Sequence, residues 1–380
     1  KGNIWLERAA SHGNVSARAY LQRTERESLI MEHARPYLAT VRAYDDSGRL
    51  LRKSTGIWLD SENLLVRDSV VEKAWKVTVE DSEGGVSAIS TIAADDSMAG
   101  FLLVRAKNPT LVASLDNSVP EAMVGQESVM IAVAPAFLPK SFFKTVVKET
   151  DYCPYLGYIV VVETGKSDES GGLGLDCQGQ NIGVWRSCDL GDGQVVNMLM
   201  PTQRIREYML KEPVSMARWQ KQRTDKDKAV SYDKAVFRAA ICSLVDKERG
   251  LAEFQKVVRQ NQTDVRGRLW IASLKSKLGK LQEAQKEADA LLKENPHLAE
   301  TFIVLADVHQ NQAKWKERAE DLVRLCELSP EMSIAYQWLG GAFYGAGEYD
   351  KSLEASKRCV QLREKCVPAW VGMCWGYKEK

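Results

Sequence analysis

A 34-residue repeat runs through the C-terminal part of this 380-residue chain and restricts what that part can fold into. The repeated positions are Pro296 and Pro330; Gly279, Ala313 and Gly347; Ala272, Ala306 and Gly340; and Phe302, Tyr336 and Trp370. Between them, apolar residues recur every three to four positions, which is typical of amphipathic helices. A fixed period of this length predicts stacked helix pairs, because one pair alone cannot bury its apolar face.

The clearest copy of the repeat reads YQWLGGAFYGAGEYDKSL from Tyr336 to Leu353. It resembles the tetratricopeptide repeat (TPR), a helix–turn–helix unit with small residues where its helices cross. The resemblance implies an all-α solenoid whose concave face binds proteins or peptides. Four copies are expected, at residues 231–263, 265–298, 299–332 and 333–366.

A fifth copy begins after the fourth, because residues 370–377 reproduce the first helix of the unit. One interpretation is a capping helix, which arrays of this kind need at their ends. The other is a chain cut from a larger protein, and the apolar residues Trp370, Met373 and Trp375 favour it, since a cap presents a polar outer face. The predicted helical domain spans 229–380 and holds about four repeats plus the first helix of a fifth.

The resemblance also assigns a binding groove to the first helix of each unit. The side chains at these positions are mostly polar, with an apolar patch near Tyr344. They lack the Lys/Asn set with which some family members hold a C-terminal carboxylate, and a solvated groove without a ligand is the alternative. The peptide-binding candidates are Arg266, Ser273, Lys277, Asp307, Gln310, Asn311, Gln337 and Tyr344.

In residues 36–210 the apolar period changes to two. Short segments of alternating or β-branched residues are separated by Gly, Asp and Ser turns, which predicts an all-β barrel or sandwich. Residues 204–210 are expected to close this domain as a helix. Residues 37–44 alternate in this way, and short strands are expected to follow near 56–59, 63–66, 75–80, 87–92, 101–105, 128–133, 143–148, 157–164, 181–186 and 194–200.

Segments of this β domain resemble trypsin-like serine proteases, and more closely their bacterial HtrA-type branch. The motifs SGG at 170–172 and IGV at 182–184 follow the spacing around the nucleophile. Residues 64–71 match the segment that carries the catalytic histidine, and its position is Ser69 here. The position of the catalytic aspartate falls at Ala99. The resemblance implies a double β-barrel that keeps only the serine of the catalytic triad.

That serine, Ser170, has no histidine in its own domain, because all four histidines lie outside residues 36–209. A serine is a weak nucleophile unless a neighbouring base takes its proton. Ser170 is therefore interpreted first as a relic in a hairpin shaped by glycines. Two alternatives stay open: activation by a lysine such as Lys166 or Lys73, or a base supplied by His12, His33 or another chain.

Two further segments flank the β domain. Residues 1–35 carry an Ala-Ala-x-x-Gly-x-x-x-Ala core, which resembles one Sel1-like repeat; an ordinary helical extension is the alternative. Pro36 is expected to end the second helix of this segment. Residues 211–228 are charged and contain Pro213, so they are interpreted as a linker that becomes helical.

Composition narrows the classes of partner. A net charge of +1 gives no reason to expect nucleic acid, and no apolar run reaches the ~18 residues of a membrane span. No phosphate-binding glycine loop or metal-ligand spacing occurs, so neither a cofactor nor a metal is expected. The eight cysteines are expected as reduced, buried thiols, with a Cys177–Cys188 disulfide as the alternative. This usage favours the cytoplasm, with the periplasm as the alternative.

The sequence therefore predicts a multidomain protein: a helical segment, a degenerate trypsin-like β domain and a TPR array. We expect a non-catalytic scaffold or regulatory protein that binds a protein or peptide partner in the concave groove. A second peptide site is expected in the barrel cleft, by strand addition beside residues 183–185. The alternative is a serine endopeptidase or hydrolase that uses Ser170 with a non-standard base.

Overall fold

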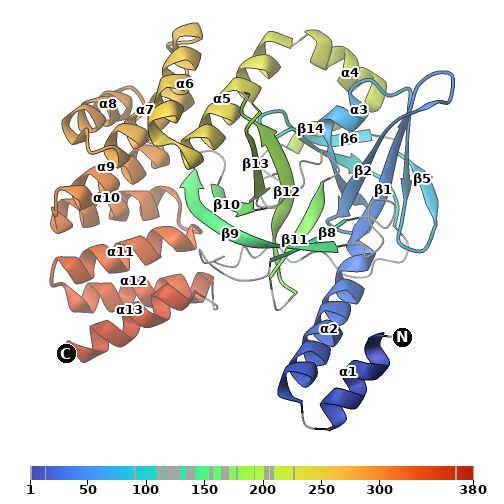
Figure 1. The fold of residues 1–380 in the computed structure, drawn as a ribbon. Helices are drawn as coiled ribbons and strands as arrows, with labels where there is room; N and C mark the ends of the chain where they lie inside the picture. The colour runs from blue at the N-terminus through green and yellow to red at the C-terminus, as the bar shows by residue number, and fades with distance from the viewer. Residues whose placement is uncertain are drawn as a thin grey trace. The chain divides into compact units, whose positions relative to one another are not determined.

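The computed structural model divides the chain into two compact units (Figure 1). The first unit is Lys1–Tyr152 with Leu156–Lys234, and the second is Cys153–Tyr155 with Ala235–Lys380. The described residues are 2–12, 14–89, 91–108, 115, 129–133, 142–153, 157–163, 171–176, 179–191, 193–200, 205, 209–225, 227–363 and 366–379.

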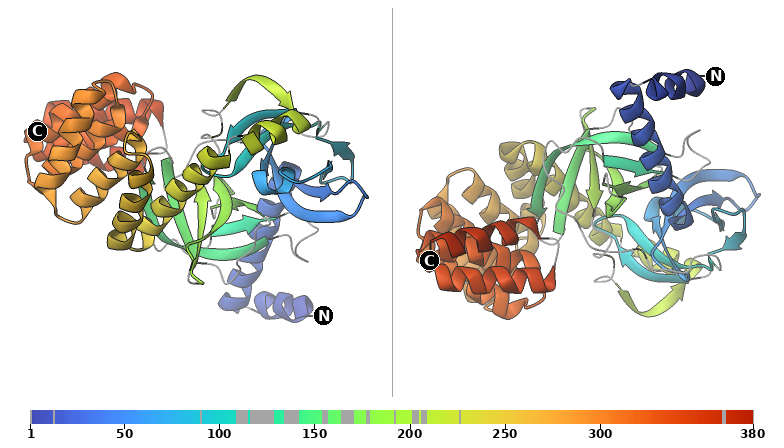
Figure 2. Two further views of the ribbon diagram at one scale, coloured as in Figure 1. Left: turned by 90° about the horizontal axis from the view of Figure 1, so that it is seen from above. Right: turned by 90° about the horizontal axis from the view of Figure 1, so that it is seen from below.

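The first unit begins with two helices, α1 (Gly2–Ser11) and α2 (Val15–Ala34), which pack on each other. The Asn14 side chain caps α2 by accepting a hydrogen bond from the Ala17 N–H at 2.9 Å. Both views in Figure 2 show α2 running from α1 to the β-sheets. Glu27 of α2 forms an ion pair with Lys144 of the second sheet, so this helix is tied to the β domain.

The first sheet has eight strands in the order β14-β6-β7-β3-β2-β1-β4-β5. Its neighbouring strands are antiparallel, and its apolar core contains Trp58, Leu64 and Val104. A single helical turn, α3 (Asp68–Val71), follows β3. The strands are β1 (Leu38–Tyr44), β2 (Leu50–Trp58), β3 (Asn63–Arg67), β4 (Lys76–Glu80), β5 (Val86–Ala88), β6 (Thr91–Asp96), β7 (Phe101–Arg105) and β14 (Met209–Ser215).

The second sheet closes into a barrel in the order β10-β13-β12-β11-β8-β9. Ile131, Trp185 and Leu199 lie in its core. Gly183 allows two strands to approach closely: its φ is +139°, and a Cβ there would lie 2.6 Å from the Met200 carbonyl oxygen. The strands are β8 (Val129–Ala132), β9 (Phe142–Cys153), β10 (Gly157–Glu163), β11 (Gly172–Leu175), β12 (Asn181–Asp189) and β13 (Val195–Met200).

Residues 211–228, predicted as a linker that becomes helical, do become helical from Met216, but they pack on the first sheet and so differ from a solvated linker. Residues Met209–Ser215 form β14, which pairs with β6 at one end of the first sheet, and Met216–Asp225 form helix α4. Pro213 is tolerated because β14 is an edge strand with an irregular register. Trp219 of α4 is 3% exposed and belongs to the core of the first sheet. The helix expected at 204–210 is wrong at its end, where Met209 and Leu210 are already in β14.

The second unit consists of antiparallel helix pairs with a 34-residue register, so the predicted C-terminal helical array is confirmed as an architecture (Figure 1). Shortly after the first helix of three successive pairs, the backbone φ is positive: 76° at Gly279, 57° at Ala313 and 78° at Gly347. This left-handed residue ends the helix and starts the turn to the second helix. The helices are α5 (Asp227–Val245), whose first residues up to Lys234 belong to the first unit, α6 (Lys247–Gln260), α7 (Val265–Lys277), α8 (Leu281–Glu294), α9 (Ala299–Asn311), α10 (Trp315–Leu328), α11 (Ser333–Gly345), α12 (Tyr349–Leu362) and α13 (Val367–Lys378).

Small residues at the repeated positions allow the helices of a pair to come close. Ala272 and Ala306 are buried, and a Cβ at Gly340 would lie 2.8 Å from the Ser356 hydroxyl of α12. The 34-residue sequence register therefore coincides with the spacing of the helix crossings. No helix of the described residues is long and apolar enough to cross a membrane.

Candidate functional site

Ser69 and Ala99 lie in neighbouring turns of the first unit. Ser69 is half-buried on α3, directly after the buried Asp68. Ala99 is fully buried in the turn between β6 and β7. The two turns are joined because the Asp68 N–H donates to the Gly100 carbonyl at 3.0 Å. The structure thus brings together the two positions that the resemblance assigns to the histidine and the aspartate, and neither side chain can accept a proton at neutral pH.

Ser170, Lys166 and Cys177 lie outside the described residues. The adjacent Gly171 is described: it is buried with a φ of +72°, and a Cβ there would lie 3.4 Å from the Thr55 carbonyl of β2. The start of β11 therefore lies close to β2 of the first sheet, and a glycine at position 171 permits this approach.

The alternative bases named from the sequence have local partners or are exposed. His12 Nδ1 lies 2.7 Å from the Arg8 carbonyl, and His33 Nδ1 lies 2.8 Å from the Leu29 carbonyl, both within their own helical segments. Lys73 is exposed after α3.

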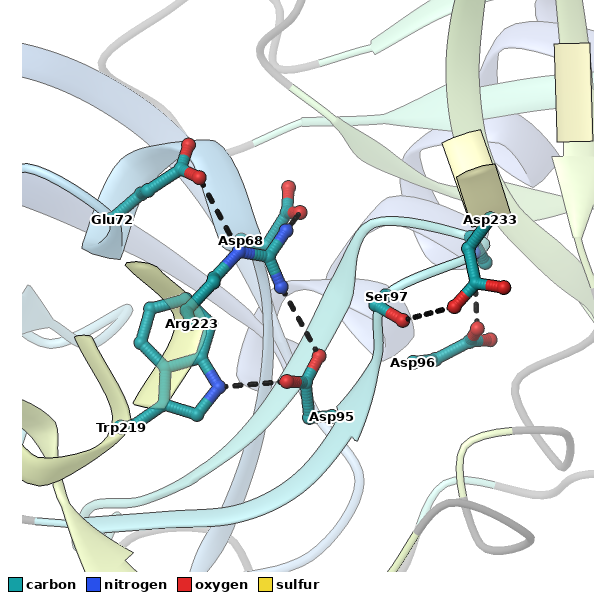
Figure 3. A network of polar contacts seen from close by, with 9 residues as sticks. Asp68, Glu72, Asp95, Asp96, Ser97, Trp219, Arg223 and Asp233 are labelled. Atoms are coloured by element: carbon teal, nitrogen blue, oxygen red, sulfur yellow. Dashed lines mark hydrogen bonds and ion pairs between the residues drawn. The ribbon is translucent and has the colours of Figure 1, made fainter. Parts of the chain in front are cut away.

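An ion cluster centred on Arg223 of α4 includes Asp68, the residue before Ser69 (Figure 3). The Arg223 guanidinium is 3% exposed and contacts three carboxylates of the first sheet and α3. Its Nη2 pairs with Asp68 Oδ2, Nε lies 3.3 Å from Glu72 Oε1, and Nη1 lies 3.4 Å from Asp95 Oδ1. The fork of the guanidinium is thus divided among three carboxylates, which fixes α4 on the sheet.

Trp219 adds a neutral donor to this cluster. Its indole Nε1 donates to Asp95 Oδ2 at 2.8 Å, and its ring lies 4.9 Å from the Arg223 guanidinium carbon. Burial raises the pKa of Asp95, while the Trp219 hydrogen bond and the Arg223 charge oppose that rise. Separately, the Ser97 hydroxyl donates to Asp233 at 2.9 Å (Figure 3). The cluster is an arrangement of satisfied ion pairs.

A second buried guanidinium, that of Arg186, reaches the same place from β12 of the barrel. A Cβ at Gly100 would lie 3.3 Å from its Nη2 and 3.2 Å from Asp68 Oδ1, so Gly100 is needed where these groups meet. Burial, followed by the positive charge of Arg67, lowers the pKa of Arg186 to about 9. Arg186 therefore stays charged at neutral pH and offers no base. It links the barrel to the turn that contains Ala99.

In the second unit, several of the predicted groove residues are buried or contact other residues of the array. Arg266 Nε pairs with Asp264 at 3.1 Å, and Ser273 is 5% exposed, which leaves little of its hydroxyl for a ligand. Gln337 accepts a hydrogen bond from the Cys366 thiol at 3.4 Å. The Tyr344 ring lies 5.9 Å from the Trp375 ring of α13.

Other predicted groove residues offer more surface. Gln310 and Asn311 are exposed at the end of α9, while Asp307 and Lys277 are half-buried. Asn311 Nδ2 donates to the Ser276 hydroxyl at 3.4 Å, so α9 and α7 are joined along this face. Among the described residues, no group of three or more His, Cys, Asp or Glu side chains could hold a metal ion.

The sequence analysis missed Arg223, Trp219 and Arg186. The first two lie in a segment interpreted as a charged linker, although a tryptophan and an arginine four residues apart share one face of a helix. Arg186 lies within a buried strand and carries no separate sequence signal. The partners of the first two, Asp68 and Asp95, are more than 100 positions away, so no local pattern identifies them.

No family model matches the chain, and no curated protein matches it significantly. Among solved structures, it is similar in part to the TPR protein TTC0263 of Thermus thermophilus, with 16% identity over 39% of this chain and 81% of that chain, at a TM-score of 0.35. It is also similar in part to MamA MSR-1 C2, with 18% identity over 40% of this chain and 86% of that chain, at a TM-score of 0.34.

Proposed function

We propose that this protein is a non-catalytic scaffold that combines a degenerate trypsin-like domain with a TPR-type peptide-binding array. One observation carries the non-catalytic part: the residue before Ser69, Asp68, is buried in an ion pair with Arg223. A serine hydrolase needs a base that exchanges a proton with the nucleophile during the reaction. Ser69 and Ala99 supply no such base, and the neighbouring Asp68 carboxylate is already paired with Arg223.

The trypsin-like assignment is supported by the eight-stranded sheet and the closed barrel within one unit. It is also supported by Gly171, which lies next to the proposed nucleophile position and faces β2. The TPR assignment is supported by the 34-residue register and by helix turns with positive φ at Gly279, Ala313 and Gly347. Its groove offers exposed amides at Gln310 and Asn311, which can hydrogen-bond a peptide backbone.

The absence of catalysis is tested with a fluorophosphonate probe, which labels activated serines. The full chain is incubated beside trypsin as a positive control and beside its own Ser170→Ala variant. We expect labelling of trypsin and none of the chain. Labelling that depends on Ser170 would show an activated nucleophile and would support the alternative, a serine hydrolase with a non-standard base.

Peptide binding is tested by screening a random peptide library on the full chain and measuring the affinity of a selected peptide. Charge introduced into the groove by Gln310→Glu with Asn311→Asp should weaken that affinity at least tenfold. The matched control is Glu354→Gln on the exposed face of α12, which should leave it unchanged. Equal effects of both variants, or no selected peptide at all, would contradict a groove on the first helices.

A further inference from the structure

Two cysteines at the C-terminal end of the array are in direct contact. Cys359 lies on α12, and Cys366 is the N-cap residue of α13. Their sulfur atoms are 3.3 Å apart, and the two residues are 0% and 1% exposed. Both are reduced, as are Cys188, Cys242, Cys326 and Cys374 among the described cysteines. A contact of this kind between thiols requires little movement to become a bond.

In the repeat register, this pair stands where the two preceding repeats carry apolar residues. One repeat earlier, the equivalent positions hold Leu325 and Met332; two repeats earlier they hold Leu291 and Leu298. Leu291 and Leu325 are fully buried, as Cys359 is. The position therefore calls for apolar packing, which leucine or methionine supplies without redox chemistry. Only in the last repeat do both members of the pair carry a thiol.

We propose that Cys359 and Cys366 form a reversible disulfide that fixes α13 to α12. A disulfide needs its sulfurs about 2.05 Å apart, so they must approach by roughly 1.3 Å. The oxidant is a small disulfide such as glutathione disulfide. One cysteine thiolate attacks it and releases one glutathione, and the second cysteine then attacks the mixed disulfide and releases another. Two protein thiols are oxidised, one glutathione disulfide is reduced to two glutathiones, and both protons end on glutathione.

Access to the buried thiols requires local opening of α13, which packs on α11 and α12 at the C-terminal end of the array. Local opening of a single element costs less free energy than global unfolding does. Cys374 is exposed on the same helix and needs no opening. Oxidation of the pair is therefore slower than modification of Cys374, and once formed the bond opposes the opening that allowed it.

The disulfide would also change a groove residue, and this consequence rests on the proposed function. In the reduced state the Cys366 thiol donates to Gln337 Oε1 at 3.4 Å. Oxidation removes that hydrogen, so the Gln337 amide becomes available for another donor. Helix α13, which the disulfide would fix, carries Trp375, and the Trp375 ring lies 5.9 Å from the Tyr344 ring. Fixing α13 thus fixes the aromatic end of the groove.

The redox equilibrium tests the proposal without reference to any ligand. The full chain is equilibrated in glutathione buffers of increasing oxidised fraction, natively and in parallel in about 8 M urea, which unfolds it. Thiols are then blocked, and disulfides are mapped by peptide mass. We expect the 359–366 bond to form in the native protein with an effective concentration at least tenfold above that in urea. An equal or lower value, or a bond to Cys374 instead, overturns the proposal.

Hydrogen exchange gives a second measurement. Amides of α13 should exchange at least tenfold more slowly in the oxidised chain than in the reduced chain. Cys366→Ala should abolish this difference, whereas Cys326→Ala, which removes another buried thiol, should preserve it. Equal exchange in oxidised and reduced wild type overturns the proposal, even if Cys366→Ala fails to fold.

The coupling to the groove has its own test. The affinity of a library-selected peptide is measured for the oxidised and the reduced chain, and we expect at least a threefold difference. A peptide that binds equally in both states overturns the coupling through Gln337. The absence of any bound peptide contradicts the proposed groove, while the redox titration still decides the disulfide.

Discussion

At the scale of single residues, the stability of the first unit depends on the three ion pairs of Arg223. One guanidinium faces Asp68, Glu72 and Asp95, and the indole of Trp219 supplies a further donor to Asp95. Buried ion pairs contribute modestly when intact, because desolvation offsets their attraction. Removing one partner is costly, since the remaining charge stays buried without compensation.

Replacing Arg223 with methionine should therefore destabilise the first unit by about 3–5 kcal/mol. The substitution keeps much of the aliphatic volume but leaves Asp68 and Asp95 without their cation. The measurement is urea unfolding followed by hydrogen exchange in β6. Arg218→Met, at an exposed arginine on the same helix, is the control and should change stability by less than about 0.5 kcal/mol. Equal losses in the two variants would contradict the buried network.

Asp321 should make the second unit sensitive to pH. Burial raises the pKa of Asp321 to about 6, although His309, whose Nδ1 lies 2.7 Å from Asp321 Oδ2, opposes the rise. Glu320 and Asp289 add to it. The folded state thus binds the proton more tightly than the unfolded state. The resulting contribution to stability is present near pH 4 and is lost as the pH rises through about 6.

The test compares wild type with Asp321→Asn, which cannot titrate. From pH 4 to pH 7, the stability of wild type relative to this variant should fall by at most about 3 kcal/mol. Protection of α10 amides in urea at each pH is the measurement. A difference that stays constant, or that grows with pH, would show that the carboxyl is not held in its protonated form.

At the scale of elements, close approach between strands depends on glycines at particular positions. Gly183 on β12 has a φ of +139°, and a Cβ there would lie 3.0 Å from the Met200 carbonyl carbon and 2.6 Å from its oxygen. Both atoms belong to the backbone of β13, the neighbouring strand, which cannot move without breaking the ladder. The barrel therefore has no room for any side chain at this position.

Gly183→Ala should destabilise the barrel by at least about 3 kcal/mol, from backbone strain and from the clash together. Gly191→Ala is the matched control: its φ is +84° but a Cβ there meets nothing within 4 Å, so it should cost only about 1 kcal/mol. Thermal unfolding of the full chain followed by near-UV circular dichroism separates the two. Similar losses would mean that φ alone, and not the β13 backbone, limits this position.

At the scale of the whole molecule, the chain forms two units with different kinds of core. The first is held by strand pairings between distant segments and by α4, whose Trp219 lies in the core of the first sheet. The second consists of consecutive helix pairs that contact their neighbours in sequence. The two units should therefore fold without each other.

A fragment of residues 227–380 should show a helical circular dichroism spectrum and unfold cooperatively, because its contacts are local. A fragment of residues 1–234 should also fold. A shorter fragment that ends at residue 215 lacks α4, and it should lose cooperative unfolding since Trp219 and Arg223 are removed together. Unfolded spectra for both longer fragments would contradict the division into two units, whereas a stable 1–215 fragment would contradict the role of α4.

Local sequence pattern accounts for much of this architecture. The 34-residue period predicts the helical array, and the change to a period of two predicts the β domain, because side-chain spacing records which face of each element is buried. The same reasoning joins β5 and β6 into one strand at 87–92, and it misses β11 and β14, since β11 is two glycines and two leucines and β14 contains Pro213. Such short or interrupted segments have no clear alternation.

Tertiary packing alone decides which residues meet across the chain. Charge makes residues 211–228 resemble a solvated linker, yet Trp219 and Arg223 are buried against Asp95 and Asp68. These partners lie 124 and 155 positions away, so no local pattern shows the contacts. In the same way, the sequence predicts Cys359 and Cys366 only as buried thiols, and their contact follows from the packing of α13 on α12. Periodicity is a local property, so the amino-acid sequence is sufficient to define it. The charge and thiol contacts depend on how separate elements pack, and for that reason only the folded chain defines them.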